Sequence, residues 1–409
     1  MRKLTLKTIY AALFVFAAML SACGGKSGQD TADTITFWHF WSEPAQEKAL
    51  KEIIAEFEKK ENCTVNATAL SWGDGKTKLL AAFNAGKAPD ILELGSDWVA
   101  QFSSAGVLRE WNGTNDRNRF ADFSIAPAMF SGKQYALPWV VDTRVLFYNK
   151  DLLKKAGLPD TPPATMSEML NAAEKIQQFE GVDGFGANGS DPHRLYKKFL
   201  PLVWSNGGYI FDSTGAPAIN SAANIEALNM YIALSRAGRI ETQRELDAAF
   251  TQGKIGFWFS GSWLTKKIEN GNPTLDYGVA LIPDMKHTGM SFAGGEYLAV
   301  NAKSDKAKLA EKFIRYLTDG ATALNFCKKV ADAGFPADKS KFSDIYFSTA
   351  KNRSVFAKQL ERSKMTPVHP RWLDIEAAIE NAVVAALYGQ KSAAQALNDA
   401  QTDIAAMVK

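Results

Sequence analysis

The sequence predicts an α/β protein of two lobes, with parallel-rich sheets flanked by helices. Three observations support this prediction. Apolar strands alternate with amphipathic helices over residues 34–94, the same alternation resumes after Tyr135, and a chain of 409 residues is long enough for two domains. Strands that alternate with helices usually form a parallel sheet covered on both faces.

The first expected strand covers residues 34–40, and residues 36–41 read TFWHFW. A strand buried on both faces explains Phe37 to Phe40. The next helix is expected to begin at Pro44, after a cap at Ser42 or Glu43. Its apolar residues recur at the i, i+3, i+4, i+7 spacing of one buried face.

The remaining elements follow from the same patterns. Further strands are expected at residues 65–70, 90–94, 145–148, 184–187, 254–259, 277–282 and 297–300. Further helices are expected at residues 76–84, 167–179, 222–237, 246–252, 306–317, 321–329, 373–387 and 392–407.

The first 22 residues have a basic head and an apolar run from Ile9 to Leu20, which is too short to span a bilayer and fits a signal peptide. The run ends in Leu20-Ser21-Ala22-Cys23, which resembles the lipobox of bacterial lipoproteins. That resemblance implies cleavage before Cys23 and a palmitate-type lipid anchor on it. The alternative is an ordinary secretory signal. Residues 24–32 are expected to form a flexible tether to a membrane of the cell envelope, so that the protein faces the periplasm or the exterior.

Charge and composition exclude several classes of protein. The formal charge of +3 comes from three basic residues in the signal segment, which has no acid, so the remaining chain is neutral and unsuited to nucleic acid. Cys63 and Cys327 are expected to be separate buried thiols, although export permits a disulfide. The four histidines lack metal-ligand spacing, so no metal is expected. Residues 184–189 fit G-x-G-x-x-G, but Asp191-Pro192 follow in place of a helix, so no dinucleotide cofactor is expected.

Tryptophans recur beside polar residues at the expected strand ends. In open α/β sheets ligands bind beyond the carboxyl ends of the strands. Any single tryptophan could equally be a core residue, but the repetition favours a binding surface. The candidate ligand-binding residues from this pattern are Trp41, Glu43, Trp72, Asp97, Trp98, Trp139, Asp142, Trp263, Arg371 and Trp372.

Indole faces beside carboxylates suit a sugar, which has an apolar C–H face and a rim of hydroxyls. Stacking that removes on the order of 60 Å² from water contributes roughly 1.5 kcal/mol. A sugar hydroxyl buried without a partner costs about 1–3 kcal/mol. Stacking therefore provides affinity, and the carboxylates select the sugar.

Four stretches carry a family resemblance: GKAPDILELGSDW (86–98), YALPWVVDTRVLFYNKDLLKKAGL (135–158), FTQGKIGFWFSGSW (250–263) and the segment from Pro367. From about Ile35 onward the chain resembles the family 1 extracellular solute-binding proteins of bacterial ABC importers, the group that contains maltose-binding protein. This implies a type II periplasmic-binding-protein fold whose hinge the chain crosses three times. The implied division is a signal peptide (1–22), a tether (23–32), an N-terminal lobe (33–140 and 284–318) and a C-terminal lobe (141–283 and 319–409).

The resemblance also implies roles for particular residues. Asp97 and Asp142 match sugar-binding carboxylates, and Trp263 and Trp372 match stacking tryptophans. Trp98 stands where maltose-binding protein has an arginine, and the loop at Glu43 differs. Lys197, next to Tyr196, replaces a stacking tyrosine. These departures mean that the resemblance does not carry the maltose identity over to this chain, and the expected ligand is a carbohydrate. In SFAGGEYLAV (291–300), Gly294 and Gly295 are expected to let the backbone approach the ligand.

The expected function is capture of a sugar, an oligosaccharide by preference, and its delivery to an ABC permease by a monomer without cofactor or catalysis. Two alternatives remain: the same fold with a glycerol-phosphate-type solute, and a lipoprotein glycosidase that uses two of Glu43, Asp97 and Asp142.

Overall fold

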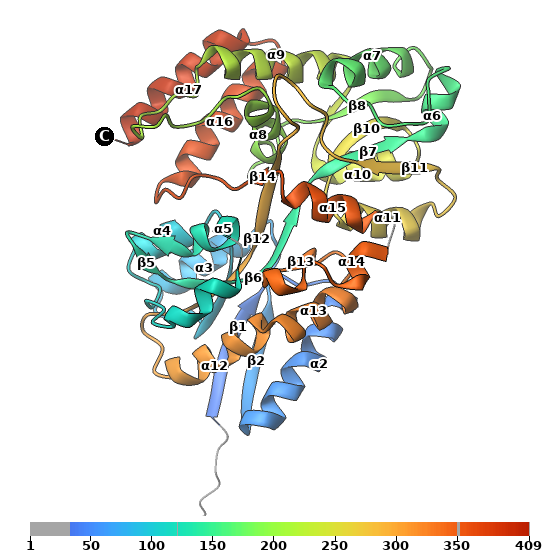
Figure 1. Ribbon diagram of the computed structural model, residues 1–409. Coiled ribbons are helices and arrows are strands. Elements are labelled where there is room, and N and C mark those ends of the chain that lie inside the picture. The colour runs from blue at the N-terminus through green and yellow to red at the C-terminus, as the bar shows by residue number, and fades with distance from the viewer. Residues whose placement is uncertain (1–32, 121, 350–351, 409) are drawn as a thin grey trace, which may run out of the picture.

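The computed structural model describes residues 33–120, 122–349 and 352–408, and two lobes lie one above the other in Figure 1. One sheet has the strand order β13-β6-β12-β3-β1-β2 with β14 beside β12, and the other has the order β11-β7-β10-β8-β9. We call the first sheet and its helices the N-terminal lobe, and the second sheet and its helices the C-terminal lobe. The predicted two-lobed α/β fold is confirmed.

The N-terminal sheet is mixed. Its strands are β1 (Asp33–His39), β2 (Cys63–Ala69), β3 (Ile91–Gly95), β6 (Ala136–Thr143), β12 (Ser291–Val300), β13 (Phe335–Pro336) and β14 (Ser363–Lys364). The pairs β1–β2 and β1–β3 are parallel, as expected, whereas β12 runs antiparallel to both β3 and β6. A separate antiparallel pair joins β4 (Met129–Phe130) to β5 (Lys133–Gln134).

Two apolar clusters cover the faces of this sheet. In β1, Phe37 belongs to one cluster and Trp38 packs against the other, as alternate strand residues must. The helices of this lobe are α2 (Pro44–Glu61), α3 (Gly75–Asn84), α4 (Val99–Ser104), α5 (Asp122–Ile125), α12 (Ala307–Thr318) and α13 (Gly320–Lys329), with 3-10 turns η1 (Thr114–Arg119), η2 (Ala126–Ala128) and η3 (Lys339–Lys341). As predicted, α2 begins at Pro44, and the Gln46 side chain accepts a hydrogen bond from the Glu43 backbone N–H.

The C-terminal lobe is built on β7 (Val145–Asn149), β8 (Asp183–Asn188), β9 (Gly238–Glu241), β10 (Ile255–Ser260) and β11 (Tyr277–Ala280). Its helices are α6 (Lys150–Lys155), α7 (Met166–Ile176), α8 (Tyr196–Ser205), α9 (Ala222–Arg236), α10 (Gln243–Thr251), α11 (Trp263–Gly271), α16 (Trp372–Leu387) and α17 (Ala393–Met407). The sequence analysis did not predict helix α8. Pro201 lies inside it, within an apolar run that has no helical periodicity.

The chain passes between the lobes with little slack. Arg144 is the single residue between β6 and β7, which belong to different sheets. Residues 281–290 then lead from β11 back to β12. Helices α14 (Ile345–Thr349) and α15 (Arg353–Leu360) precede the final return, and α15 contacts β6, β7 and β12.

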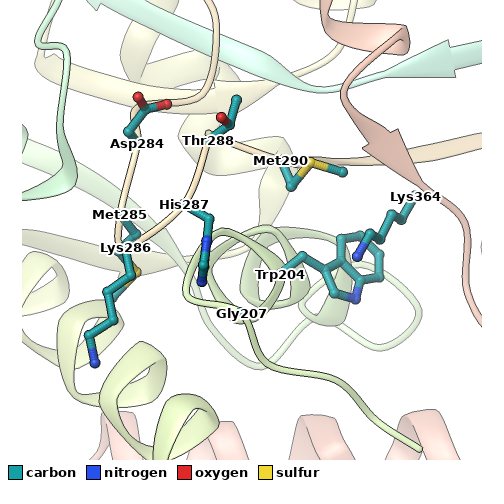
Figure 2. Close-up of a pocket in the computed structure, with 9 residues that line it drawn as sticks. All are labelled: Trp204, Gly207, Asp284, Met285, Lys286, His287, Thr288, Met290 and Lys364. Carbon is teal, nitrogen blue, oxygen red and sulfur yellow. The ribbon is translucent and has the colours of Figure 1, made fainter. Parts of the chain in front are cut away.

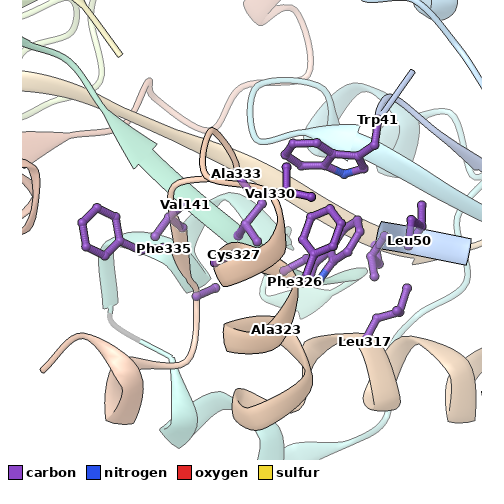
Figure 3. Close-up of a cluster of buried hydrophobic side chains, with 14 of the residues drawn as sticks. Trp41, Leu50, Val141, Leu317, Ala323, Phe326, Cys327, Val330, Ala333 and Phe335 are labelled. Atoms are coloured by element: carbon purple, nitrogen blue, oxygen red, sulfur yellow. The ribbon is translucent and has the colours of Figure 1, made fainter. Parts of the chain in front are cut away.

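The N-terminal lobe does not end at residue 318, where the sequence analysis placed its last boundary. Helix α13 packs on α2, and β13 pairs with β6, so both elements belong to the N-terminal lobe. The physical reason is an aromatic cluster (Figure 3). The Phe326 ring of α13 stacks on Trp139 with centroids 4.8 Å apart, and it meets the edge of Trp41 at 5.0 Å.

Two expected ligand-binding tryptophans are therefore core residues in this structure. Trp41 is 8% exposed and Trp139 is 1% exposed, and both belong to the cluster around Phe326. Cys63 and Cys327 are free and buried, as expected. Cys23 and the proposed signal peptide and tether lie outside the described residues. Within the described ranges, no helix combines the length and hydropathy that a membrane span requires.

Phe326→Ala should destabilise the protein by about 3–5 kcal/mol, because it leaves a cavity between Trp41 and Trp139. Urea unfolding followed by tryptophan fluorescence measures this loss. Tyr209→Ala is a matched control, because Tyr209 is an exposed aromatic residue. An equal loss in both variants would show that the cluster does not hold α13 in place.

Candidate functional site

A hydrogen bond joins the two lobes at the end of β3. The Tyr196 hydroxyl, at the start of α8, donates to Asp97 Oδ2 at 3.2 Å. Tyr196 is fully buried, and its ring meets the edges of the Phe292 and Trp372 rings. The predicted residue Asp97 thus lies between the lobes and is fixed by a C-terminal partner.

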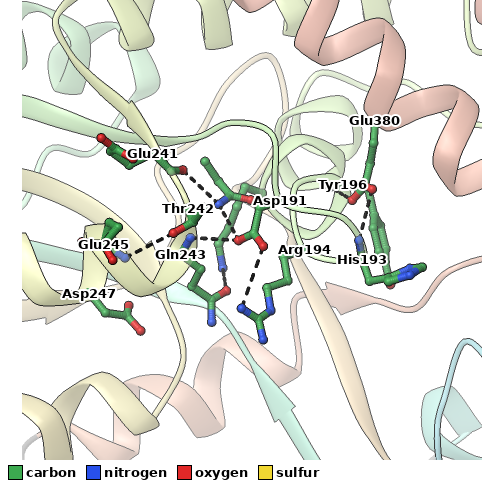
Figure 4. A network of polar contacts seen from close by, with 12 residues as sticks. Asp191, His193, Arg194, Tyr196, Glu241, Thr242, Gln243, Glu245, Asp247 and Glu380 are labelled. Carbon is green, nitrogen blue, oxygen red and sulfur yellow. Dashed lines mark hydrogen bonds and ion pairs between the residues drawn. The ribbon is translucent and has the colours of Figure 1, made fainter. Parts of the chain in front are cut away.

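An acidic group lies behind this contact, on α16. Glu380 accepts hydrogen bonds from the backbone N–H groups of His193 at 3.1 Å and Tyr196 at 3.2 Å, as Figure 4 shows. His193 Nδ1 lies 2.5 Å from Glu376 Oε1, and this hydrogen bond raises the pKa of His193. Burial, together with the charge of Glu376, raises the pKa of Glu380 to about 7.

Lys76 of α3 faces this group from the N-terminal lobe. Burial lowers the pKa of Lys76, and the charges of Asp97 and Glu376 oppose that shift. Its ammonium group lies 5.6 Å from the centre of the Trp98 ring. One cation and several carboxylates from different lobes therefore share the space around Asp97.

A second group surrounds Trp263, at the start of α11. The Trp263 indole N–H donates to Asp247 Oδ2 at 3.0 Å, and Lys267 donates to the same oxygen at 2.8 Å. The Arg144 guanidinium lies 5.1 Å from the Trp263 ring and pairs with Asp142 at 2.6 Å. Asp247 therefore fixes the ring, and the predicted residues Asp142 and Trp263 lie together beside Arg144.

The glycines of β12 lie at this junction, but they approach protein and not an open space. Gly294 pairs with Asp142 and Gly295 with Val141. A Cβ on Gly295 would lie 2.3 Å from the Val140 carbonyl oxygen, so a side chain there would force β6 and β12 apart. The required close approach is strand to strand. Their proposed contact with ligand remains a prediction.

Glu296 follows these glycines and was not predicted as a site residue. Burial raises its pKa to about 8; the charge of Asp142 adds to the shift, and Arg144 opposes it. Glu296 therefore carries a proton through most of the neutral range.

The predicted tryptophans differ in exposure. Trp72 is 42% exposed and stacks on Phe40 with centroids 4.2 Å apart, and Trp263 is partly exposed. Trp98 and Trp372 are 4% and 1% exposed, so their faces pack against protein. The expected set of open indole faces is thereby reduced to Trp72 and Trp263.

Two predicted charged residues lie at exposed ends of helices. Glu43 is exposed before α2, and Arg371 is exposed before α16, where it pairs with Asp374 at 3.0 Å. Neither contacts the groups around Asp97 or Trp263 in this structure. The sequence analysis missed several charged and polar residues around these groups, because they lie on elements far apart in the sequence that only the fold brings together. These residues are Lys76, His193, Tyr196, Lys198, Asp247, Glu296, Glu376 and Glu380.

A hollow of about 600 Å³ lies elsewhere, between the end of α8, residues 284–290 and Lys364 (Figure 2). It contains none of the predicted residues. Within the described ranges, no group of three or more His, Cys, Asp or Glu side chains is placed to hold a metal ion.

Comparison with known proteins places this geometry in a family. The sequence family of bacterial extracellular solute-binding proteins matches residues 41–322, and the chain belongs to that family. A Brucella abortus protein described as a binding protein is 26% identical over 98% of this chain and 98% of its own length. The maltodextrin-binding protein MdxE of Bacillus subtilis is 25% identical over 98% of this chain and 97% of its own length.

The fold is also that of a solved structure. The GacH receptor of Streptomyces glaucescens, determined unliganded and with acarbose, matches with a TM-score of 0.82 at 24% identity. The match covers 92% of this chain and 98% of that one. This likeness, to a protein solved with a bound ligand, shows the two-lobed fold.

The raised pKa of Glu296 predicts a pH-dependent stability. The pKa of Glu296 is about 8 in the folded state, whereas the ordinary pKa of a glutamate is 4.5. The free energy of unfolding should therefore fall as the pH rises through this range. Glu296→Gln should fall less, as urea unfolding at pH 5, 7 and 9 can measure, while the exposed control Glu245→Gln should follow the wild type. Parallel curves for wild type and Glu296→Gln would contradict the assignment.

Proposed function

We propose that this protein is an extracytoplasmic carbohydrate-binding protein, which captures a sugar between its lobes and delivers it to an ABC permease. An oligosaccharide is the preferred ligand. The observation that carries the proposal is the hydrogen bond from Tyr196 to Asp97, because it brings a predicted ligand-binding carboxylate of one lobe against the other lobe.

The proposed binding mode uses both lobes. The exposed face of Trp72 and the partly exposed face of Trp263 stack on sugar rings, at roughly 1.5 kcal/mol each for about 60 Å² buried. Asp97 and Asp142 accept hydrogen bonds from sugar hydroxyls, and each hydroxyl so paired avoids a cost of about 1–3 kcal/mol. Because contacts to both lobes exist only when the lobes are together, the ligand stabilises the closed state.

The named relatives support a carbohydrate. MdxE is named for maltodextrin, and GacH was solved with acarbose. By the resemblance to maltose-binding protein, Trp98 and Lys197 stand where that protein has ligand-binding residues of other types. We therefore propose a sugar other than maltose. The family's description as extracellular solute-binding proteins also favours binding over catalysis.

We further propose that Cys23 carries a lipid and that residues 24–32 tether a monomer to the membrane. The folded lobes would then stay close to the permease, which reads lobe closure. Loss of membrane association in Cys23→Ala, measured by fractionation of cells, tests the anchor.

A thermal-shift screen with neutral and charged mono- and oligosaccharides tests the function, since a ligand that binds the folded state raises its melting temperature. At least one carbohydrate should raise it in a concentration-dependent way. Glycerol phosphate belongs in the screen as the competing solute. If no carbohydrate shifts the transition, the proposal is wrong, and hydrolysis of any sugar in the panel would indicate an enzyme instead.

Tyr196→Phe should weaken binding of the identified sugar about threefold to tenfold, because it removes a hydrogen bond to a charged group between the lobes. Calorimetry measures the affinity. Tyr231→Phe is the matched control, because that hydroxyl donates to the Asn188 carbonyl within the C-terminal lobe. It should lower stability and leave affinity unchanged; equal affinity in all three proteins would argue against closure at Asp97.

A further inference from the structure

Three basic side chains lie around two rings, that of the proposed stacking residue Trp263 and that of Phe292. The Arg144 guanidinium lies 5.1 Å from the Trp263 ring centre and 5.0 Å from that of Phe292. The Lys197 ammonium lies 5.4 Å from the Phe292 centre, and that of Lys198 lies 5.9 Å from the Trp263 centre. Because they share these two rings, the three basic groups lie in one cluster, which we call the cation cluster.

The carboxylates nearby do not balance this charge. Asp142 pairs with Arg144 alone at 2.6 Å. Asp247 accepts from Lys267, Ser260 and two indole N–H groups, and no ion pair joins it to the cluster in the described ranges. Glu296 is protonated through most of the neutral range because its pKa is raised to about 8. Within the described ranges, Asp142 is therefore the one carboxylate that forms an ion pair with the cluster. Asp247 acts on Lys198, and Glu376 on Lys197, only through their charges.

The cluster also has donors without strong partners. Arg144 is buried, and its Nε has no hydrogen-bond partner among the residues that the structure describes. The Lys198 amine is almost fully buried and reaches only the Gln243 amide oxygen, at 3.3 Å. Burial and the neighbouring Arg144 lower the pKa of Lys198 well below its usual range, so its charge is disfavoured in the absence of an anion. Buried donors of this kind cost stability unless something pairs with them.

A purely structural role does not account for the whole arrangement. Cation–π attraction to Trp258, Trp263 and Phe292 favours each cation singly. It does not favour three of them together, and Arg144 and Lys197 both act on Lys198 by repulsion.

We propose that the cation cluster of Arg144, Lys197 and Lys198 receives the anionic group of an acidic sugar, the carboxylate of a uronic acid, whose ring stacks on Trp263. This inference rests on the proposed function, since it specifies the class of sugar. The two oxygens of a carboxylate can accept one hydrogen bond from the Arg144 Nε–H and one from a lysine amine. A phosphate group has the same charge sign, so phosphorylated ligands form a separate arm of the test.

Calorimetry on the protein with a set of oligouronates, their neutral methyl esters, neutral oligosaccharides, a sugar phosphate and glycerol phosphate tests this assignment. An ester keeps the stacking face and removes the charge. At least one free acid should bind about tenfold or more tightly than its ester, as expected for a charge-assisted hydrogen bond.

Lys197→Gln should remove most of this preference for the acid, and Lys197→Arg should retain it. Lys266→Gln is the matched control, because Lys266 is an exposed lysine of α11 that pairs with Glu269 outside the cluster. It should bind the acid as the wild type does. Lys197 is only partly buried, so these variants avoid the folding risk of changing Lys198.

Four results would overturn the inference. If neutral sugars or esters bind as tightly as acids, the acidic sugar is wrong while the carbohydrate function stands. If the sugar phosphate binds and the uronates do not, the carboxylate assignment is wrong while the carbohydrate function stands. If only glycerol phosphate binds, the sugar proposal also gives way to the glycerol-phosphate alternative. If no member of the set binds, the proposed function itself fails.

Discussion

The ion pair between Asp142 and Arg144, at 2.6 Å, lies where the chain passes from one lobe to the other and next to the candidate binding site. Arg144 is the only residue between strands of two different sheets, so the lobes are joined there by a single peptide unit on each side. The same side chain lies over Trp263 and Phe292. A rotation at Arg144 would therefore change the geometry of the candidate site directly.

The two groups of the site respond to closure differently. Around Trp263, Asp247 holds the indole N–H within the C-terminal lobe, so this surface is already formed before any ligand arrives. Around Asp97, the partner Tyr196 comes from the other lobe, and the contact exists only when the lobes meet. A preformed half and a half completed by closure are what a ligand needs in order to shift an open–closed equilibrium.

Much of the fold follows from local patterns. The strand at residues 34–40 and the helix at Pro44 appear almost as predicted, because alternation, helical periodicity and capping are local properties. The exposure of individual tryptophans is not local. Trp41 and Trp139 follow the same strand-end pattern as Trp72. Yet Phe326, which is 187 residues from Trp139 and 285 residues from Trp41 along the chain, packs against both. The same packing keeps α13 in the N-terminal lobe, which no boundary signal indicated.

The site was predictable only where it coincided with strand ends or with the family resemblance. Asp97, Asp142 and Trp263 were identified in that way. Tyr196 lies on α8, which the sequence patterns did not predict, and its contact with Glu380 depends on how α8 meets α16. The cations around Trp263 come from the hinge and from α8, so their common charge became apparent only from the fold.

The central claim is that a sugar holds the lobes together, and the distance between them measures it most directly. Fluorescent labels at Lys48→Cys in α2 and Lys391→Cys before α17 lie on exposed positions of opposite lobes, and the native cysteines of the described ranges, Cys63 and Cys327, are buried. Single-molecule energy transfer should show a longer and a shorter distance without ligand, and saturation with the sugar found in the screen should leave only the shorter one. An identical distance distribution with and without bound sugar would contradict the account.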